Sequence, residues 1–374
     1  MRRIAAHHLI SRGEVIARPL VECDSEGRIM SVEQWQRLDN IPHVEFYSGV
    51  LCPGFVNAHC HLELSYLRGA IEQGTGFGGF ARAIGMVRGQ YTMQQRQQAL
   101  AAADAQMWAE GMQAVADIIN DDSSLEHKQR SNIRYRNFAE LFGLNTPADS
   151  MNHLLGHPAT TLTPHSTYSL QSATFASASE ADTLSLHFME SPDEEALYRG
   201  EGSLAAWYER MGWECDFLHY GSPARRVIGQ LTPDKRLLLV HGCCMTQHDI
   251  ELLHRHFTHK PTFVVCPQSN RYISALRPCI ELLIKGNCHV AIGTDSLASN
   301  HNLSILEELK LLPELPLATA LEWATWGGAT ALGMEAEIGS IEIGKRPGVV
   351  LIEGVEQCDG ELRLLPTARS RRLI

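Results

Sequence analysis

The sequence predicts an α/β protein, a (β/α)8 TIM barrel with a small β-sandwich domain built from both chain termini. Between residues 49 and 297, eight short apolar runs alternate with helical stretches, the pattern of a barrel in which each strand precedes a helix. Residues 1–51 alternate short β-like runs with turns, and the tail IGSIEIGKRPGVVLIEG returns to β patterning. We therefore predict a β-sandwich domain from 1–51 plus 336–374 and a barrel domain from 52–335.

The eight predicted barrel strands end at turns, and these strand ends are where a barrel gathers its functional side chains. In chain order the strands are GVLCPGFVNAHCH, MQAVADIIN, IRYRNFAELFG, TTLTPHSTY, TLSLHFMES, RLLLVHGCC, TFVVCPQSN and HVAIGTDSL. Helical stretches separate most of them.

The first predicted strand ends in the pair His59 and His61. Among 18 histidines in 374 residues, chance alone gives about one His-x-His, so the spacing is weak by itself. On a strand, however, residues two apart share a face, and Cys60 between them points into the core. The other such pair, His254 and His256, lies in QHDIELLHRHF, whose helical spacing predicts a solvated helix surface.

Other predicted strands also end in polar residues that can bind metal or transfer protons. These are His165 in the fourth strand, His187 followed by Glu190 in the fifth, His241 in the sixth and Asp295 in the eighth. Any one of them alone is more often structural, but together they indicate one site. His59, His61, His187 and Asp295 can supply three imidazoles and a carboxylate to a divalent metal, zinc or alternatively Fe(II), which would lower the pKa of a bound water.

Two glutamates near these residues each have two interpretations. Glu190 lies three residues after His187, where the strand gives way to a loop, and is placed for general acid/base catalysis; the competing interpretation is an exposed residue of the acidic run ESPDEE. Glu63 shares the predicted strand face of His59 and His61. It contacts the substrate or holds a ligand histidine in its tautomer, and the sequence favours neither role.

The blocks PGFVNAHCHLELS, LHFMES, LLVHG, CPQSN, GTDSLASN and ATALGMEAEIGSIEIGKRPG resemble, in this order, those of the amidohydrolase superfamily, in its nucleobase and nucleoside deaminase branch. The resemblance implies that His59, His61, His187 and Asp295 bind one metal ion, that Glu190 transfers protons, and that His241 positions the activated water and the developing oxyanion. It also implies that His165 faces the substrate. Binuclear members carry a carboxylated lysine in the fourth strand; TLTPHSTYSL has none, which predicts a mononuclear site.

The predicted reaction is hydrolytic deamination at a cyclic amidine. The activated water loses its proton to Asp295 or His241 and attacks the carbon that bears an exocyclic amine, Glu190 protonates the adjacent ring nitrogen, and ammonia leaves. HLELS is most similar to deaminases of adenine-type nucleosides, including aminodeoxyfutalosine deaminase, so a purine-type base or nucleoside is the expected substrate. The alternative is hydrolysis of an amide C–N bond or a C–halide bond of a heterocycle at the same metal.

Substrate contacts are predicted from Glu63, His165, Ser296 and Arg88, and Arg271 and Tyr272 lie in candidate loop regions. The segment GTGFGGF, with Gly74, Gly76 and Gly79, matches G-x-G-x-x-G but does not directly follow a strand. A flexible loop over the barrel mouth is therefore expected rather than a dinucleotide site.

Composition narrows the class of partner. The net charge is −11 without a basic stripe, which argues against nucleic acid. The ten cysteines show no framework spacing, as expected of reduced thiols in a cytoplasmic chain, and no apolar run reaches the 18 residues of a membrane span. A small-molecule substrate is expected, and the oligomeric state stays open, with a homodimer as one alternative.

Overall fold

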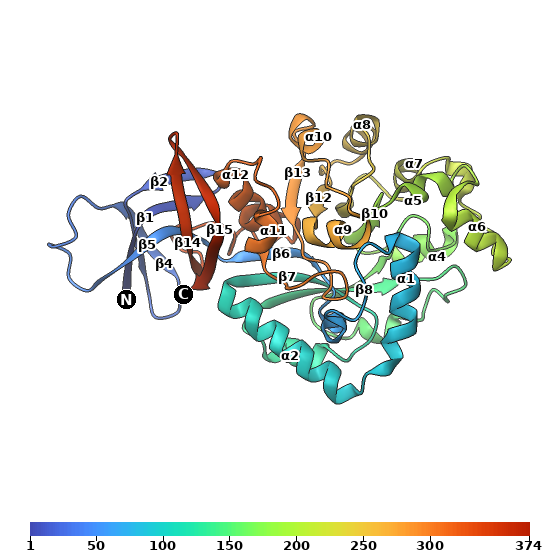
Figure 1. Cartoon of the computed structure of the whole chain (residues 1–374), viewed down its shortest axis with the longest axis horizontal. Coiled ribbons are helices and arrows are strands. Elements are labelled where there is room, and N and C mark those ends of the chain that lie inside the picture. Colours follow the sequence, from blue (N-terminus) through green and yellow to red (C-terminus); the bar gives the residue numbers. More distant parts are fainter.

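The computed structural model describes residues 1–374 and contains the predicted barrel (Figure 1). Two four-stranded parallel sheets form its wall. The first contains β6 (Phe55–Cys60), β7 (Met112–Ile119), β8 (Arg134–Leu141) and β9 (Thr160–Pro164), and the second contains β10 (Thr183–Phe188), β11 (Arg236–His241), β12 (Thr262–Val265) and β13 (His289–Ile292). Two parallel bridges, Cys60 to Asp295 and Ser166 to His187, join the sheets at both seams, which confirms an eight-stranded barrel.

The barrel strands are apolar on both faces because the inner face fills the barrel and the outer face packs on helices. Small and branched side chains such as Ala116, Val240 and Ala291 belong to one cluster of fifteen buried residues. Their opposite faces join a cluster of 51 buried residues that includes Cys60 and the helices. Cys60 is therefore a core residue, as predicted.

Helices and short turns connect the strands and surround the barrel (Figure 1). The α-helices are α1 (Gly76–Val87), α2 (Met93–Glu110), α3 (Leu125–Arg130), α4 (Ser172–Ala178), α5 (Pro192–Leu197), α6 (Gly202–Arg210), α7 (Pro223–Gln230), α8 (Gln247–His256), α9 (Pro267–Ser274), α10 (Ile280–Lys285), α11 (Ile305–Leu309), α12 (Leu317–Glu322) and α13 (Gly328–Ala331). The 3-10 helices are η1 (Leu62–Leu67), η2 (Arg88–Gln90), η3 (Asn152–Leu154) and η4 (Leu218–Tyr220), and η5 (Trp323–Gly327) is a π-helix between α12 and α13.

Two local predictions need correction. The glycine-rich segment is not a flexible loop beyond Gly74 and Thr75, because α1 begins at Gly76. Its apolar residues recur at helical spacing, as at Phe80 and Ile84, and this pattern outweighs the low helix propensity of glycine. His254 and His256 do lie on a helix, α8, but both are half-buried rather than solvated, and His256 Nε2 lies 2.9 Å from the Leu231 carbonyl oxygen.

Both termini contribute to one seven-stranded mixed sheet, which lies beside the barrel (Figure 1). It contains β1 (Arg2–Ser11), β2 (Glu14–Ala17), β3 (Pro19–Cys23), β4 (Ile29–Gln34), β5 (Val44–Pro53), β14 (Val349–Cys358) and β15 (Glu361–Arg372). The order is β15-β14-β5-β1-β3-β4, with β2 paired to β1. The β unit predicted from the two termini is thus present. The predicted domain boundaries, 1–51 plus 336–374 for this unit and 52–335 for the barrel, stay a proposal.

Gly54 marks the passage from the mixed sheet into the barrel. The run GVLCPGFVNAHCH, read as one strand, is two: β5 ends at Pro53 in the mixed sheet and β6 begins at Phe55 in the barrel. A Cβ at position 54 would lie 2.6 Å from the Pro347 carbonyl oxygen, so the close approach of these two segments requires glycine.

None of the helices combines the length and the apolar character that crossing a membrane requires.

Candidate metal centre

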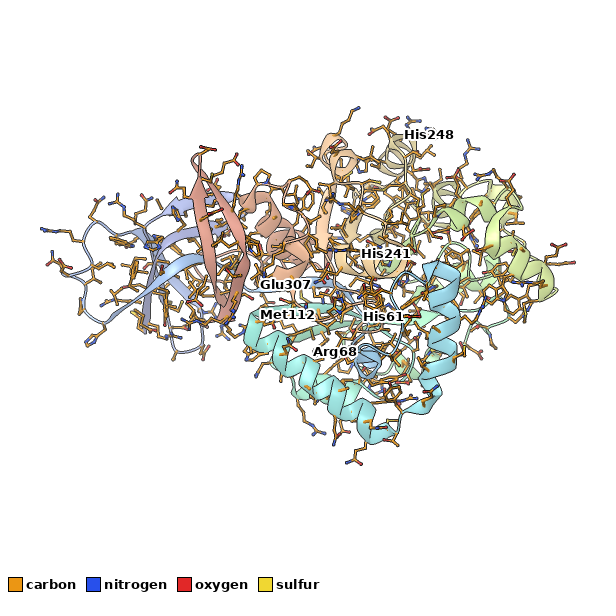
Figure 2. All side chains as sticks on the ribbon, in the orientation of Figure 1. His61, Arg68, Met112, His241, His248 and Glu307 are labelled. Carbon is orange, nitrogen blue, oxygen red and sulfur yellow. The ribbon has the colours of Figure 1, made fainter.

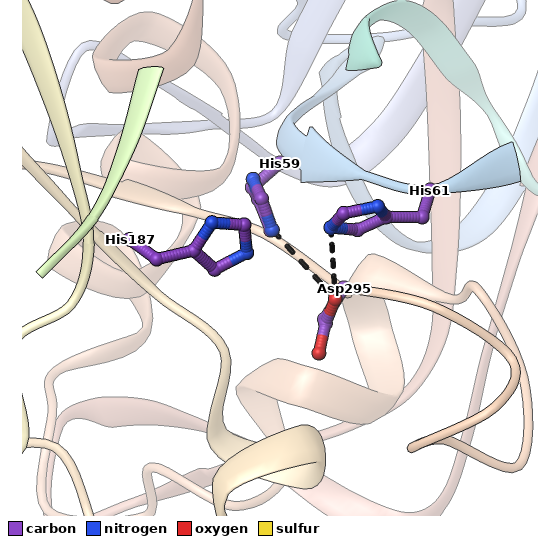
Figure 3. A group of neighbouring side chains, drawn as sticks. All are labelled: His59, His61, His187 and Asp295. Carbon is purple, nitrogen blue, oxygen red and sulfur yellow. Dashed lines mark ion pairs between the residues drawn. The ribbon is translucent and has the colours of Figure 1, made fainter. Parts of the chain in front are cut away.

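Four predicted metal ligands converge at the C-terminal ends of three strands (Figure 3). His59 lies in β6 and His61 directly follows it, His187 lies in β10, and Asp295 follows β13. One ligand atom of each lies within 4.8 Å of the others, and all four residues are buried. Asp295 Oδ1 lies 3.6 Å from His59 Nε2 and 3.5 Å from His61 Nε2. These separations exceed normal hydrogen bonds and suit ligands that share an ion.

The donor set fits a metal ion, and its ligand atom His59 Nε2 has no other partner. Both ring nitrogens of His59, which is fully buried, and Nδ1 of His61 are buried without a hydrogen bond. A buried polar atom without a partner destabilises the fold by about 1–3 kcal/mol, so a cation is the expected neighbour. Three imidazole nitrogens and one carboxylate oxygen suit zinc or Fe(II).

Hydrogen bonds on the far side of the ligands select which atoms face the centre. His187 Nδ1 lies 3.0 Å from the His165 carbonyl oxygen, to which it donates, so Nε2 is left free as a ligand atom. Asp295 Oδ2 accepts from Ser269 Oγ at 2.6 Å and Ser299 Oγ at 2.8 Å, leaving Oδ1 toward the histidines. Burial alone would raise the pKa of Asp295, but His59 and His61 hold it well below its usual range, so it is a carboxylate.

His241 ends β11 and lies beside the four-residue cluster, inside the barrel with His61, whereas His248 lies outside on α8 (Figure 2). The ring centroid of His241 is 5.9 Å from that of His59. Asn270 Nδ2 donates to His241 Nδ1 at 2.9 Å, which places the ring proton of the neutral imidazole on Nε2. Burial lowers the pKa of His241 to about 3, so the ring is neutral at pH 7.

Glu190 follows β10 by two residues and is a partly buried carboxyl, not an exposed residue of the acidic run. Its side chain is 13% exposed, and Oε1 lies 3.9 Å from His241 Nε2. Burial, followed by the charges of Asp295 and Glu194, raises the pKa of Glu190 to about 8. The group is therefore mainly protonated at pH 7 and able to donate a proton.

A cavity of about 260 Å³ opens onto this centre. His61, His187, His241 and Asp295 are among its lining residues. Its wall is half apolar, and includes Leu64, Phe77, Phe80, Ile84, Phe142, Leu144, Tyr168, Leu204, Trp207, Tyr208, Trp213 and Ile273. Of the predicted substrate contacts, His165, Ser296 and Arg88 line the cavity.

Glu63, Arg271 and Tyr272 are not in the cavity wall. The strand-face argument for Glu63 is wrong because β6 ends at Cys60 and the chain turns into η1. Glu63 Oε2 accepts from the Asn120 backbone N–H at 3.0 Å, and Oε1 lies 3.6 Å from the Arg88 guanidinium. Since Asn120 and Arg88 both line the cavity, Glu63 supports the wall from behind.

Glu140 and Asn120 also line the cavity, and neither was predicted as a site residue from the sequence. Glu140, near the end of β8, accepts from His165 Nδ1 at 2.7 Å and from Asn120 Nδ2 at 3.1 Å. Burial acts to raise the pKa of Glu140, but the His165 ring lowers it to about 2. Glu140 is therefore a carboxylate, and it orients the His165 ring. Asn120, Glu140 and Asn270 lie at the ends of the second, third and seventh predicted strands. Examining the polar residues at the ends of these three strands as well would therefore have found them.

The sequence profile of the Amidohydrolase family matches residues 50–368. An adenosine deaminase of Helicobacter pylori is 27% identical over 353 residues, covering 86% of this chain and 84% of that protein. Curated relatives with higher identity, 34–39%, match over only 28–30% of their own length.

Two solved structures share the fold. The aminofutalosine deaminase of Helicobacter pylori in complex with methylthio-coformycin superposes with a TM-score of 0.81 at 24% identity, covering 94% of this chain and 92% of that chain. An adenosine deaminase from Xanthomonas campestris with bound zinc superposes with a TM-score of 0.73 at 23% identity, covering 94% of this chain and 84% of that chain.

Proposed function

Because this chain belongs to the amidohydrolase family, we propose that it is a metal-dependent aminohydrolase that releases ammonia from the exocyclic amine of a purine-type base or nucleoside. The observation that carries the proposal is the convergence of His59, His61, His187 and Asp295 beside the partly buried Glu190 in the wall of the cavity. The ligand atom His59 Nε2 has no other partner. That arrangement combines a metal centre with a proton donor.

His59, His61, His187 and Asp295 would hold one divalent ion, with zinc as the first choice and Fe(II) as the alternative. The Xanthomonas campestris relative with bound zinc supports this choice. A single ion is proposed because the fourth strand has no lysine that could bridge a second one. When bound, the ion would supply Lewis-acid activation of a water molecule.

The side chains divide the proton transfers between them. Asp295 is the base, since it is a carboxylate and His241 Nε2 already carries a proton. The water oxygen bonds to the carbon that bears the amine, and the electron pair of the ring C=N bond moves to the nitrogen, which Glu190 protonates. His241 Nε2–H stabilises the negative charge on the oxygen. Asp295 then gives its proton to the amine, and the C–N bond breaks with its electron pair leaving on ammonia. The remaining hydroxyl proton passes to the Glu190 carboxylate as the carbonyl forms.

The cavity suits an adenine-type nucleoside. A planar base is bound well by a half-apolar, aromatic wall, while His165, Ser296 and Arg88 provide polar contacts for ring nitrogens or hydroxyls. The relatives named above are adenosine and aminofutalosine deaminases, which supports the same substrate class. His165 is the best-placed contact because Glu140 fixes its ring.

The test is ammonia release by metal-replete protein across adenine nucleosides, aminopurines, aminopyrimidines and guanine, with a chelator-treated sample as control. Chelator-sensitive release from the adenine nucleosides is the expected result. If metal-loaded, folded protein released no ammonia from any of these compounds, the proposal would be refuted. Hydrolysis of an amide or a halide on a heterocycle would then be the next reaction to assay.

A further inference from the structure

We infer that Glu194 is a positioning residue that holds the proton donor Glu190 in place by joining the turns after β9 and β10. The inference rests on the proposed function because that function gives Glu190 its role. Glu194 lies in α5, is 1% exposed and forms no salt bridge. A buried carboxyl without a cationic partner is costly, so its contacts need a physical explanation.

The turn that carries Glu190 is strained, and hydrogen bonds to Met189 and Glu190 help to hold it. Met189, directly before Glu190, has a φ of +46°, a left-handed conformation that non-glycine residues rarely adopt. The Met189 carbonyl accepts from the Cys244 backbone N–H at 3.0 Å. On the other side, Glu194 Oε2 accepts from the Glu190 backbone N–H at 3.3 Å. Without Glu194, only one of these two restraints would remain.

The second oxygen of Glu194 reaches the neighbouring turn. Thr167 Oγ1 donates to Glu194 Oε1. Directly after Thr167 in the sequence, Tyr168 and Ser169 line the cavity. A single carboxyl group therefore connects the turn that carries the proton donor with a turn that forms the substrate wall.

The Thr167 turn is itself firmly anchored, so it can serve as a fixed support. Its carbonyl oxygen accepts from Arg226 Nη1 at 2.7 Å and from Tyr198 Oη at 2.6 Å. Arg226 is fully buried, and its guanidinium lies 3.9 Å from the Phe217 ring centroid. Because the support is rigid, the position of Glu190 depends on the link through Glu194.

The test compares Glu194→Ala with Glu194→Gln, using Glu195→Ala on the half-exposed side of the same helix as the matched control. Glu194→Ala should lower kcat by roughly 10–100-fold, since a displacement of about 1 Å costs up to 10²-fold. Glu194→Gln should retain kcat, because its amide oxygen can accept from the Glu190 N–H and its amide nitrogen can donate to Thr167 Oγ1. Equal losses in both variants would overturn the inference.

Crystal structures of the variants provide a readout that is independent of turnover. In Glu194→Ala, the turn at residues 189–191 should shift and the 3.9 Å approach of Glu190 Oε1 to His241 Nε2 should be lost, with the metal content unchanged. Glu194→Gln should keep the approach. An unmoved turn in Glu194→Ala would overturn the inference.

These outcomes separate the inference from the proposed function. If wild-type protein deaminates nothing, the proposed function fails, and the position of the turn in the Ala variant still decides the role of Glu194. If wild-type protein is a deaminase and Glu194→Ala keeps its kcat, only the inference fails. Should Glu194→Ala not fold, Thr167→Val removes one hydrogen bond of the same link and should lower kcat several-fold; an unchanged kcat there would contradict the inference.

Discussion

Replacing Glu190 with glutamine removes the ionisable carboxyl group and keeps nearly the same side-chain shape. Glu190 is partly buried, and its pKa is raised to about 8, so at pH 7 roughly nine-tenths of it is protonated. Glutamine occupies the same volume and can still donate a hydrogen bond, but it cannot give up a proton to a ring nitrogen. The four metal ligands are untouched by the substitution. We therefore expect a loss that is confined to the chemical step.

The size of the loss follows from the role. A positioned general acid contributes about 10²–10⁴-fold to the rate, which is roughly 3–5 kcal/mol of activation free energy. Because the acid must be protonated, kcat of the wild type should decline as pH rises through about 8, the pKa of Glu190. The variant has no group to titrate at this position, so its residual rate should lack that decline.

The assay is steady-state ammonia release at pH values from 6 to about 10, with the metal content measured on the same samples. The control is Glu195→Gln, whose side chain is 44% exposed and which should behave as the wild type. A Glu190→Gln variant that keeps more than about one-tenth of the wild-type kcat, or that shows the same alkaline decline, would refute proton transfer by Glu190.

Three other substitutions test the centre and its surroundings. Asp295→Asn removes a carboxylate ligand, so it should lower the amount of bound metal, measured by mass spectrometry of the purified protein. Its activity should fall by at least about 100-fold. A full metal content in this variant would contradict the role of Asp295 as a ligand. Glu140→Ala frees the His165 ring and should raise KM about tenfold with a smaller change in kcat; an unchanged KM would remove His165 from substrate binding. Arg226→Met removes the guanidinium donor from the carbonyls of both Thr167 and Leu170 and should lower the free energy of unfolding, measured in urea, by about 2–4 kcal/mol, whereas exposed Arg225→Met should not.

Several features follow from the sequence because they depend on local rules. The alternation of eight apolar runs with helical stretches predicts the barrel, and parallel strands bring their C-terminal ends together at one rim. That rule alone places His59, His187 and Asp295 near one another, and the structure brings them within reach of one ion. The pairing of both termini in one sheet follows from their shared β patterning.

Other predictions failed where a strand ends or a loop folds, because strand periodicity says nothing beyond the last strand residue. Strand alternation predicts that Glu63 shares one strand face with His61. Instead, β6 ends at Cys60, and Glu63 lies in η1 and contacts Asn120. The glycines of GTGFGGF suggested a loop, whereas tertiary packing supports a helix there that lines the cavity.

The tertiary structure alone decides which atoms of the site face one another. Asn270 sets the protonated nitrogen of His241, and the left-handed backbone at His241 and Asp295, with φ values of +76° and +56°, aims their side chains. Such contacts join residues from different strands, so they depend on register and turn conformation, which one strand's sequence does not encode. The residue types that could form a metal centre are thus readable along the chain, but the contacts that orient Glu190, His241 and Asp295 exist only once the strands have closed.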